Sequence, residues 1–543
     1  MLSTAHRRRL GALLVTSSLA AALTLSGCAV QGAATPAPVA AGGDVSERNP
    51  GSYAALPIPD GQIDRAVDAL PGLVRAAMAD TQVPGVAVGV TYRGKTVFAQ
   101  GFGVRRVGSP GAVDADTVFQ LASLSKSVGA TVTAREVSKG VLTWDTPVSA
   151  VLPGFALADP WVTQHLTIAD LYSHRSGLPD HAGDDLEEIG YGRAEVLKRL
   201  RLAPLSPFRT TYQYTNFGIT AAGEAVAAAS GVGWETLSER ELYAPLGMTS
   251  TSSRFADFMA RTNRASGHVR DSGTWQPTFQ RQPDAQSPAG GVSSSVNDLT
   301  KWMALLLGDG TVGGDQLIKP DALTPALSPE MLNHPAPSPD ARAGFYGFGF
   351  NAGTSASGRT VLSHSGAFAL GAGTAFALLP SADVGIVVLT NAAPVGAAER
   401  VVNQFLDLVQ YGEPTFDWPT LTERGFAPFS KPFGALAGKQ PPASPAPARR
   451  DSAYTGTYRN TYYGDATVTA GPGGLALVIG PSRIRYPLTH WDGDTFTFAL
   501  RSENAEPGSV SKVTFSNAGR GAGAATRMVV EYFDQYHLGT FTR

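Results

Sequence analysis

The feature that most constrains the fold is the placement of strand-like segments in two distant parts of the sequence. Residues 86–90 alternate valine with smaller residues, and the turn Arg93-Gly94-Lys95 separates them from a second apolar run. This pattern predicts a β-hairpin. The other segments, TVLSHSGAF, GTAFALLP and DVGIVVLTN, follow residue 360 and are apolar, β-branched and bounded by turns. Residues 141–330 carry helical segments broken by long loops, so we expect a mixed α/β domain.

The hairpin contains a short pattern that is also typical of a phosphate-binding loop. Residues 89–96 read GVTYRGKT and fit G-x-x-x-x-G-K-[ST]. Such a loop needs a helix directly after the Lys-Thr pair, because the helix N-terminus holds the anion. Here Lys95-Thr96 enters a predicted strand instead. We therefore expect no nucleotide partner.

Charge gives no indication of a nucleic-acid partner either. The chain has 43 Lys and Arg against 45 Asp and Glu, a formal net charge of −2, and its basic residues are scattered. Proteins that bind nucleic acid usually concentrate positive charge on one face. Hydrophobic residues make up 43% of the chain, which is typical of a globular protein.

The first 28 residues have the shape of an export signal. A basic cluster, Arg7-Arg8-Arg9, precedes an apolar run that is short for a membrane-spanning helix. The run ends in Leu25-Ser26-Gly27-Cys28, which contains the chain's single cysteine and resembles the lipobox of bacterial lipoproteins. The alternative is an ordinary signal peptide that happens to contain a cysteine. We predict lipidation at Cys28, export, and a membrane anchor in the cell envelope that faces the periplasm or the exterior.

Composition divides the rest of the chain. Residues 29–61 are rich in Ala, Gly and Pro and predict a flexible tether. Apolar residues recur at helical spacing from Ile63 to Met78 and again at about 395–410. We expect a catalytic domain over 62–412, a proline-rich linker over 413–450, and a small all-β domain of short strands and glycine turns over 451–543.

A serine and a lysine at the start of a predicted helix carry the clearest chemical signal. Ser123 and Lys126, in VFQLASLSK, are one helical turn apart and share a face. The helix continues through SVGATVTAREVSKG and is expected to stop at Gly140. Unpaired N–H groups of its first turn can bind an anion. Alone, Ser-x-x-Lys is weak evidence, because it also occurs by chance at solvated helix starts.

Two further sequence motifs follow Ser123-x-x-Lys126 along the chain. Tyr214-Thr215-Asn216 lies in TYQYTNFGIT, and His364-Ser365-Gly366 lies in the predicted strand VLSHSGAF. With Ser123-x-x-Lys126, they resemble the serine β-lactamase and penicillin-binding protein superfamily, most closely its class C branch. The resemblance covers about residues 62–410 and includes LTIADLYSHRSGLPDH, ELYAPLGMTST and SPAGGVSSSVNDLTKWMALLL.

The resemblance implies a fold and a set of roles. The fold would be an antiparallel sheet with helices on both faces and an inserted helical subdomain. Ser123 would be the nucleophile, Lys126 would accept its proton or keep the local charge suitable, and Tyr214 would be a general base or proton shuttle. Either of these two partners would need a lowered pKa. The remaining predicted substrate-binding residues are Asn216, His364, Ser365, Gly366 and Ala367, and the backbone N–H groups of Ser123 and Ala367 would form the oxyanion hole.

The third element departs from the pattern of true β-lactamases. There a lysine precedes Thr/Ser-Gly, whereas this chain has His364, which is mostly uncharged near neutral pH. A histidine at this place is familiar among esterases and peptidases of the superfamily. We therefore expect an exported serine hydrolase that cleaves a small-molecule ester, amide or peptide through an acyl-enzyme, with activity that changes where His364 titrates.

Two alternatives stay open. One is a true class C β-lactamase or D-Ala-D-Ala carboxypeptidase, and the other is a catalytically silent, penicillin-binding-like receptor. No metal or organic cofactor is expected. His174 and His181, with Asp180 and Asp184, could suggest a metal site, but no helix carries paired ligands, and a structural loop is the simpler interpretation.

Overall fold

The computed structural model describes residues 54, 56–517 and 523–543. The predicted signal peptide, the lipobox with Cys28 and most of the predicted tether lie outside the described residues. No helix in the described part of the chain is long and apolar enough to span a membrane.

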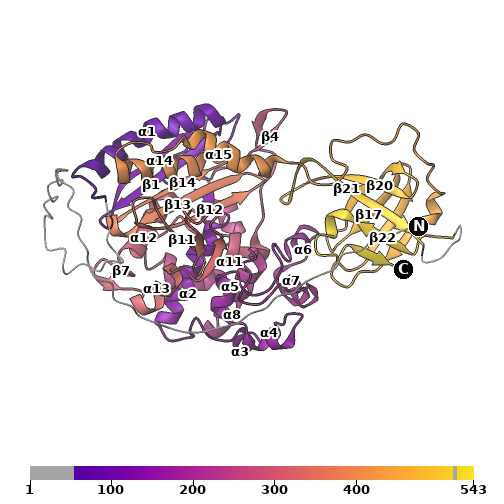
Figure 1. The fold of residues 1–543 in the computed structure, drawn as a ribbon, viewed down its shortest axis with the longest axis horizontal. Helices are drawn as coiled ribbons and strands as arrows, with labels where there is room; N and C mark the ends of the chain where they lie inside the picture. Colours follow the sequence, from indigo (N-terminus) through magenta and orange to yellow (C-terminus); the bar gives the residue numbers. More distant parts are fainter. Residues whose placement is uncertain (1–53, 55, 518–522) are drawn as a thin grey trace, which may run out of the picture. The chain divides into compact units, whose positions relative to one another are not determined.

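The expected hairpin and the late strands join in one antiparallel sheet of eight strands (Figure 1). The order is β2-β1-β14-β13-β12-β11-β10-β9, and β1 pairs with β14 from Val86 opposite Thr390 to Tyr92 opposite Val384. Arg93 and Gly94, both with positive φ, make the tight turn between β1 and β2. The strands are β1 Gly85–Tyr92, β2 Lys95–Gly103, β9 Met331–His334, β10 Gly344–Tyr346, β11 Asn351–Thr354, β12 Thr360–Phe368, β13 Ala372–Leu379 and β14 Val384–Thr390.

Helices cover both faces of this sheet, as expected. The helices α1, Gln62–Thr81, and α14, Ala397–Tyr411, lie side by side on one face (Figure 1). Their buried side chains, such as Leu70 and Phe405, pack against strand residues such as Val88. The helix α12, Val296–Leu307, packs on the opposite face against β1 and β14. The sheet is thus buried on both sides.

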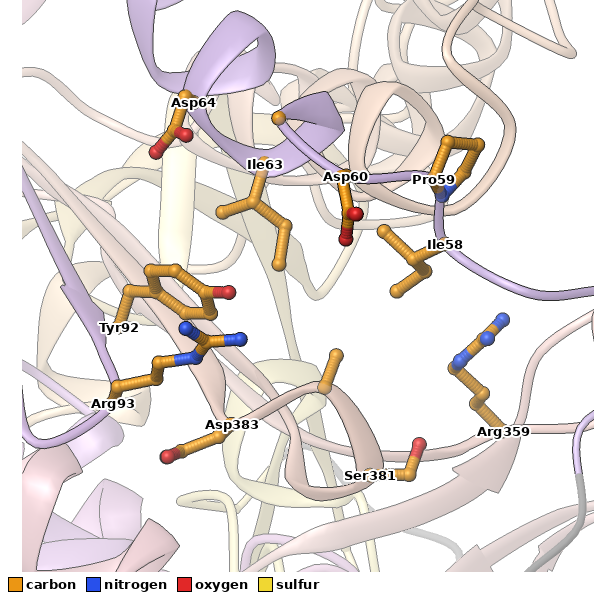
Figure 2. A pocket seen from close by; sticks show the side chains of 12 residues that line it. Ile58, Pro59, Asp60, Ile63, Asp64, Tyr92, Arg93, Arg359, Ser381 and Asp383 are labelled. Carbon is orange, nitrogen blue, oxygen red and sulfur yellow. The ribbon is translucent and has the colours of Figure 1, made fainter. Parts of the chain in front are cut away.

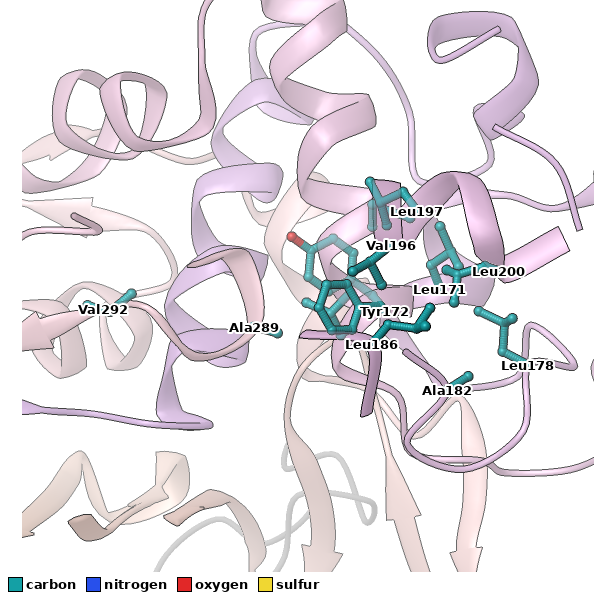
Figure 3. Close-up of a cluster of buried hydrophobic side chains, with 14 of the residues drawn as sticks. Leu171, Tyr172, Leu178, Ala182, Leu186, Val196, Leu197, Leu200, Ala289 and Val292 are labelled. Atoms are coloured by element: carbon teal, nitrogen blue, oxygen red, sulfur yellow. The ribbon is translucent and has the colours of Figure 1, made fainter. Parts of the chain in front are cut away.

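The region between β2 and β9 is mostly helical, and its short elements share one core. Figure 3 shows part of this core, where Leu171, Leu186 and Val196 meet. The α-helices of this region, apart from α12, are α2 Leu124–Ser138, α3 Val148–Val151, α4 Pro160–His165, α5 Ile168–Tyr172, α6 Asp184–Glu188, α7 Arg193–Arg199, α8 Asn216–Ser230, α9 Trp234–Ser238, α10 Phe255–Ala260, α11 Ser287–Gly290 and α13 Pro320–Leu327. Three two-stranded ribbons complete it: β3 Phe119–Gln120 with β6 Ser293–Ser294, β4 Val269–Asp271 with β5 Thr274–Gln276, and β7 Thr311–Val312 with β8 Asp315–Gln316.

The range expected to be a linker contains a helix, α15, Trp418–Phe426. Its first turn includes Pro419, where proline costs nothing because the N–H group has no partner there. The Asp417 side chain caps it by accepting a hydrogen bond from the Thr420 N–H group at 3.2 Å. The many prolines of this segment concealed the helix in the sequence.

The C-terminal segment forms two antiparallel sheets, in agreement with an all-β prediction for this part of the chain. The first has the order β15-β16-β17-β18 and the second the order β19-β20-β21-β22-β23. Their strands are β15 Gly456–Tyr458, β16 Ala466–Gly471, β17 Gly474–Ile479, β18 Ile484–Pro487, β19 Thr489–Asp492, β20 Thr495–Ser502, β21 Ala505–Ser516, β22 Arg527–Val530 and β23 Thr540–Thr542. Aromatic rings such as Tyr454, Phe496 and Phe515 fill the core between strands.

A cavity of about 510 Å³ lies where the start of α1 meets two turns of the large sheet (Figure 2). Ile58 and Ile63 border it on one side, and Arg93 and Asp383 border it on the other. None of the predicted site residues lines this cavity. They meet elsewhere, at the junction of the large sheet and the helical region.

Candidate active site

Ser123 stands at a strained turn that leads from β3 into α2. The preceding residue, Ala122, has a φ of 48°, in the left-handed region that costs a residue with a side chain about 1–2 kcal/mol. Ser123 itself is the N-cap residue of α2, and Lys126 follows one turn later. The predicted helix is confirmed, and Gly140, with a φ of 76°, lies just beyond its end. The turn fixes the serine at the edge of a cavity.

Lys126 is fully buried, and its amine is held by three oxygen atoms. Nζ donates hydrogen bonds to Ser123 Oγ at 2.9 Å, to Asn216 Oδ1 at 2.7 Å and to the carbonyl oxygen of Ala289 at 3.1 Å. Burial lowers the pKa of Lys126 from 10.5 to about 7, against the opposing charge of Asp184. A substantial fraction of this amine is therefore neutral at pH 7 and can accept a proton.

Tyr214 approaches the serine from the other side. Its hydroxyl donates a hydrogen bond to Ser123 Oγ at 2.7 Å, and Lys126 Nζ lies 4.6 Å from the centre of its ring. Burial raises the pKa of Tyr214 well above its usual value of 10, because a phenolate is disfavoured away from water. The lowered pKa that a basic tyrosine needs is thus absent here, and the hydroxyl stays protonated near neutral pH.

Asn216 begins α8 and ties the lysine to an acidic side chain. While its Oδ1 accepts from Lys126, its Nδ2 donates to Asp184 Oδ2 at 2.8 Å. The same carboxylate oxygen lies 2.8 Å from His181 Nδ1. Burial alone would lower the pKa of His181, but the hydrogen bond and charge of Asp184 outweigh it and raise that pKa. Asp184 thereby links the Lys126 network to a partly exposed histidine.

An aromatic layer stands behind Tyr214. The ring of His174 lies 4.6 Å from that of Tyr214 and 5.0 Å from that of Tyr346. His174 Nδ1 accepts a hydrogen bond from the Thr215 N–H group at 3.1 Å, and burial pushes the pKa of His174 well below 6.5. This residue acts as a neutral support for the Tyr214 loop. Among the described residues, no group of three or more His, Cys, Asp or Glu side chains is arranged to hold a metal ion.

His364 points away from solvent and bonds to a neighbouring tyrosine. Its Nε2 lies 2.8 Å from the hydroxyl of Tyr346, and its Nδ1 lies 2.6 Å from the carbonyl oxygen of Ser365. Burial, and then the charge of Lys126, lower the pKa of His364 to about 3. The side chain is therefore neutral at physiological pH, as expected. A pKa this low argues against the expectation that titration of His364 shapes the activity near neutral pH, because the charged form is strongly disfavoured.

Gly366 allows β12 to pass close to the nucleophile. A Cβ atom built on Gly366 would lie 3.0 Å from the Ser123 nitrogen and would clash with the carbonyl oxygen of Leu121. Thr374, on the neighbouring β13, donates to that same carbonyl at 2.8 Å and holds the two segments together. Ser365 and Ala367 flank the glycine and are exposed to the cavity. The glycine is thus a steric requirement for this approach.

A cavity of about 660 Å³ opens beside Ser123. Its wall joins residues of the predicted site to acidic and aromatic side chains from several elements. The predicted residues in it are Ser123, Tyr214, Asn216, His364, Ser365 and Ala367. The structure thus brings all three sequence elements to one place, with Lys126 directly behind the serine.

A comparison with known families now gives the identity of the fold. The sequence model of the family described as "Beta-lactamase" matches residues 70–410. The chain belongs to the β-lactamase family. Residues 440–539 match a separate family described as a domain of unknown function, DUF3471.

Relatives in the family carry varied names. The chain is 26% identical to unguisins hydrolase ungD of Aspergillus violaceofuscus over 478 residues, which cover 81% of this chain and 84% of the relative. It is 31% identical to penicillin-binding protein 4 of Amycolatopsis lactamdurans over 44% of this chain and 60% of the relative. It is 31% identical to esterase EstB of Burkholderia gladioli over 32% of this chain and 47% of the relative. The family thus includes hydrolases, esterases and penicillin-binding proteins.

Two solved structures share the fold. A penicillin-binding protein homologue from Pyrococcus abyssi aligns with a TM-score of 0.57 and 18% identity, over 88% of this chain and all of that one. A class C β-lactamase from Rhodobacter sphaeroides aligns with a TM-score of 0.52 and 23% identity, over 63% of this chain and 98% of that one. The predicted fold class, an antiparallel sheet flanked by helices with an all-β addition, is confirmed.

Sequence reasoning missed several residues of this β-lactamase-family site. Asp184 was assigned to a structural loop, yet it contacts Asn216 directly. Tyr346 had no signal in the sequence, because it comes from the short strand β10 and meets His364 only in the folded sheet. The backbone oxygen of Ala289 accepts a hydrogen bond from Lys126. Ala289 lies in the stretch SPAGG, which is part of the sequence that resembles the family.

Proposed function

We propose that this protein is an exported serine hydrolase that cleaves an ester or amide bond of a small molecule through an acyl-enzyme on Ser123. The main support is that Ser123 Oγ accepts two hydrogen bonds at the edge of the cavity, one from Lys126 Nζ at 2.9 Å and one from Tyr214 Oη at 2.7 Å. A serine hydroxyl becomes a useful nucleophile only when a neighbouring group takes its proton. Both neighbours are within the distance that proton transfer requires.

Lys126 takes the proton in this proposal. Its pKa of about 7 supplies a neutral amine at working pH, whereas Tyr214 stays protonated. Ser123 Oγ bonds to the substrate carbonyl carbon while its proton moves to Lys126 Nζ. The bond between the carbonyl carbon and the leaving group then breaks, the Tyr214 hydroxyl gives its proton to the departing oxygen or nitrogen, and Tyr214 regains a proton from Lys126. Water attacks the acyl-enzyme by the reverse route, and Ser123 recovers its proton.

The oxyanion is stabilised by backbone N–H groups of Ser123 and Ala367. The nitrogen of Ser123 lies at the N-terminus of α2, where unpaired N–H groups and the helix dipole favour negative charge. The close approach of Gly366 to this nitrogen brings β12, and with it Ala367, to the same place. Two such donors, fixed before the reaction, commonly contribute most of the stabilisation of a tetrahedral intermediate.

Neutral acyl esters suit this site better than substrates that carry a carboxylate. The third element offers His364, which is uncharged, where true β-lactamases offer a lysine. A β-lactam with a free carboxylate therefore loses one charged hydrogen bond, about 1.5–3 kcal/mol. The similarity to a relative called an esterase supports an ester as the bond that is cleaved.

Two measurements test the proposal. Purified protein should hydrolyse short p-nitrophenyl esters, turn over nitrocefin far more slowly, and gain one adduct from a fluorophosphonate probe, as seen by intact-mass spectrometry. Ser123→Ala should lose both the ester turnover and the adduct while keeping its fold, because only a hydroxyl is removed. An adduct of the same size on the Ala variant would refute Ser123 as nucleophile. Fast nitrocefin turnover without esterase activity would instead overturn the substrate class.

Export and lipid anchoring rest on the sequence of residues 1–28 alone. In this proposal the signal is cleaved before Cys28, which then carries two or three acyl chains, because one chain gives only marginal membrane binding. Cys28→Ser should move the protein from the membrane fraction to the soluble fraction. If the unaltered protein already fractionates as soluble, the anchor is wrong, although the catalytic proposal stands.

A further inference from the structure

The acidic side chains of the catalytic cavity differ in how many hydrogen-bond and ion-pair partners they have within the protein. Glu187 contacts the guanidinium of Arg281 and the amide of Gln286. Glu503 accepts hydrogen bonds from the backbone N–H groups of Ala369 at 2.9 Å and Leu370 at 3.2 Å. Both carboxylates are thus engaged by groups that belong to the protein.

Glu399 has fewer such partners. It lies in the first turn of α14 and lines the cavity, where the side chain of Ser365 gives it a hydrogen bond. Among the described residues, no Lys or Arg side chain lies within 4.0 Å of its carboxylate. Burial raises the pKa of this carboxyl to about 7, and its own backbone N–H group and Ser365 offset that effect only in part. Glu399 is only partly buried, but a carboxylate on a cavity wall without a neighbouring cation is still poorly stabilised, and a ligand cation would stabilise it.

The cations of the same cavity are committed or distant from Glu399. Arg281 is held by Glu187 and also lies 4.0 Å from Glu503. Lys126 is enclosed by its three oxygen partners behind Ser123. Lys431 lines the cavity but forms no ion pair with Glu399. Glu399 in its ionised form therefore presents to the cavity a negative charge that no Lys or Arg side chain of the described residues pairs with.

Apolar rings line the same cavity as this carboxylate. Pro394, Phe426 and Phe429 line the same cavity, and Phe429 is 58% exposed. Phe426 and Phe429 pack with ring centres 5.5 Å apart, so they form one continuous apolar surface. Aromatic faces also attract organic cations. An alkyl chain that ends in an ammonium group matches this combination.

We propose that Glu399, with Ser365 and the rings of Phe426 and Phe429, forms a subsite for a cationic amine carried by the substrate on an apolar chain. The inference rests on the proposed hydrolase function and adds to it the charge of the substrate. The site selects an amine-bearing ester or amide over its neutral analogue, and the neutral analogue over one that carries a carboxylate.

Three esters of matched length measure this preference. They are the p-nitrophenyl esters of 6-aminohexanoate, which is cationic, and hexanoate, which is neutral, and the mono-p-nitrophenyl ester of adipate, which is anionic. We expect kcat/KM to be about tenfold higher for the cationic than for the neutral ester, the size of one charged hydrogen bond. A second set places the same charges on the alcohol side of acetate esters, since the amine can belong to either half of the substrate. Preference for the cation in either set supports the subsite, and preference in neither overturns it.

Variants assign the preference to Glu399. In Glu399→Gln the ratio of kcat/KM for the cationic ester to that for the neutral ester should fall to about one, and in Glu399→Lys the anionic ester should become the favoured one. Glu413→Gln removes an equal charge from an exposed residue just beyond α14 and should keep the wild-type ratio. A ratio that survives in Glu399→Gln would refute the assignment. Because each ratio is measured within one variant, a general loss of activity does not imitate the effect.

Fluorophosphonate labelling distinguishes a failure of the amine subsite from a failure of the proposed hydrolase function. If Ser123 labels and all esters turn over without charge preference, the subsite is wrong and the hydrolase stands. If Ser123 neither labels nor turns over any ester, the proposed function is wrong, and the subsite falls with it.

Discussion

The catalytic cavity has two walls that are built in different ways. The helical wall, formed by the starts of α2 and α8, carries Ser123, Lys126 and Asn216, and each polar group in it contacts another. The sheet wall, formed by β12 and the start of α14, carries His364 and Glu399. There one histidine is neutral and one carboxylate lacks a cation.

The difference indicates that the two walls have separate roles, one in the reaction and the other in the choice of substrate. The helical wall needs fixed distances, because proton transfer fails when a hydrogen bond lengthens. Its polar groups therefore form hydrogen bonds with one another, and few of them are left to bind a ligand. The sheet wall needs only to complement a substrate, so its charges can stay unmatched until a ligand arrives. Changes in the helical wall should reduce turnover of every substrate, whereas changes in the sheet wall should alter the relative rates of different substrates.

The largest expected effect comes from Lys126→Met, which removes the proton acceptor but fills the same buried space. Ester turnover and the rate of labelling by a fluorophosphonate should both fall by about 10²–10⁴-fold, the usual contribution of a general base. Lys198→Met is the control, because Lys198 is an exposed lysine of α7 that pairs with Glu195 at the surface.

The pH dependence of the wild type sharpens this prediction. The neutral amine is the active form, and its pKa is about 7, so activity should rise with pH through 7 and be lost below it. Stopped assays of kcat/KM from pH 5 to 9 check the sign. Rapid labelling of the Met variant would show that the helical wall does not work through Lys126.

A smaller effect, still on every substrate, is expected from Gly366→Ala, where the two walls touch. The added methyl group would meet the Leu121 carbonyl and the Ser123 nitrogen, and would push β12, with the Ala367 N–H group, away from Ser123. Loss of one such donor costs about 10²–10³-fold in kcat. Gly353→Ala, on the neighbouring β11, is the control, because a Cβ atom there meets nothing within 4 Å. Equal kcat values for the two variants would contradict a steric role for Gly366.

The sequence predicted the helical wall better than the sheet wall, for a physical reason. Ser123 and Lys126 are joined by helical periodicity, so their contact follows from local geometry. The hairpin and the late strands were likewise visible, because period-two patterns are local. Tyr346 and Glu399 come from other elements, and only strand order and helix packing bring them near His364 and Ser365. The pKa values followed burial, which a sequence does not reveal: of the two candidate bases, burial lowered the pKa of Lys126 and raised that of Tyr214.

The smallest effect is expected from His364→Gln, and it decides which wall controls the pH profile. Glutamine keeps a hydrogen-bonding group near the Tyr346 hydroxyl but cannot titrate, so kcat/KM should fall only several-fold, by about one hydrogen bond. The pKa of His364 is about 3 in the wild type, so the histidine already lacks charge throughout the assay range. The acid limb near pH 7 should therefore remain in the variant, because it belongs to Lys126. If that limb disappears with His364, the titrating group lies in the sheet wall, and the division of labour between the two walls is wrong.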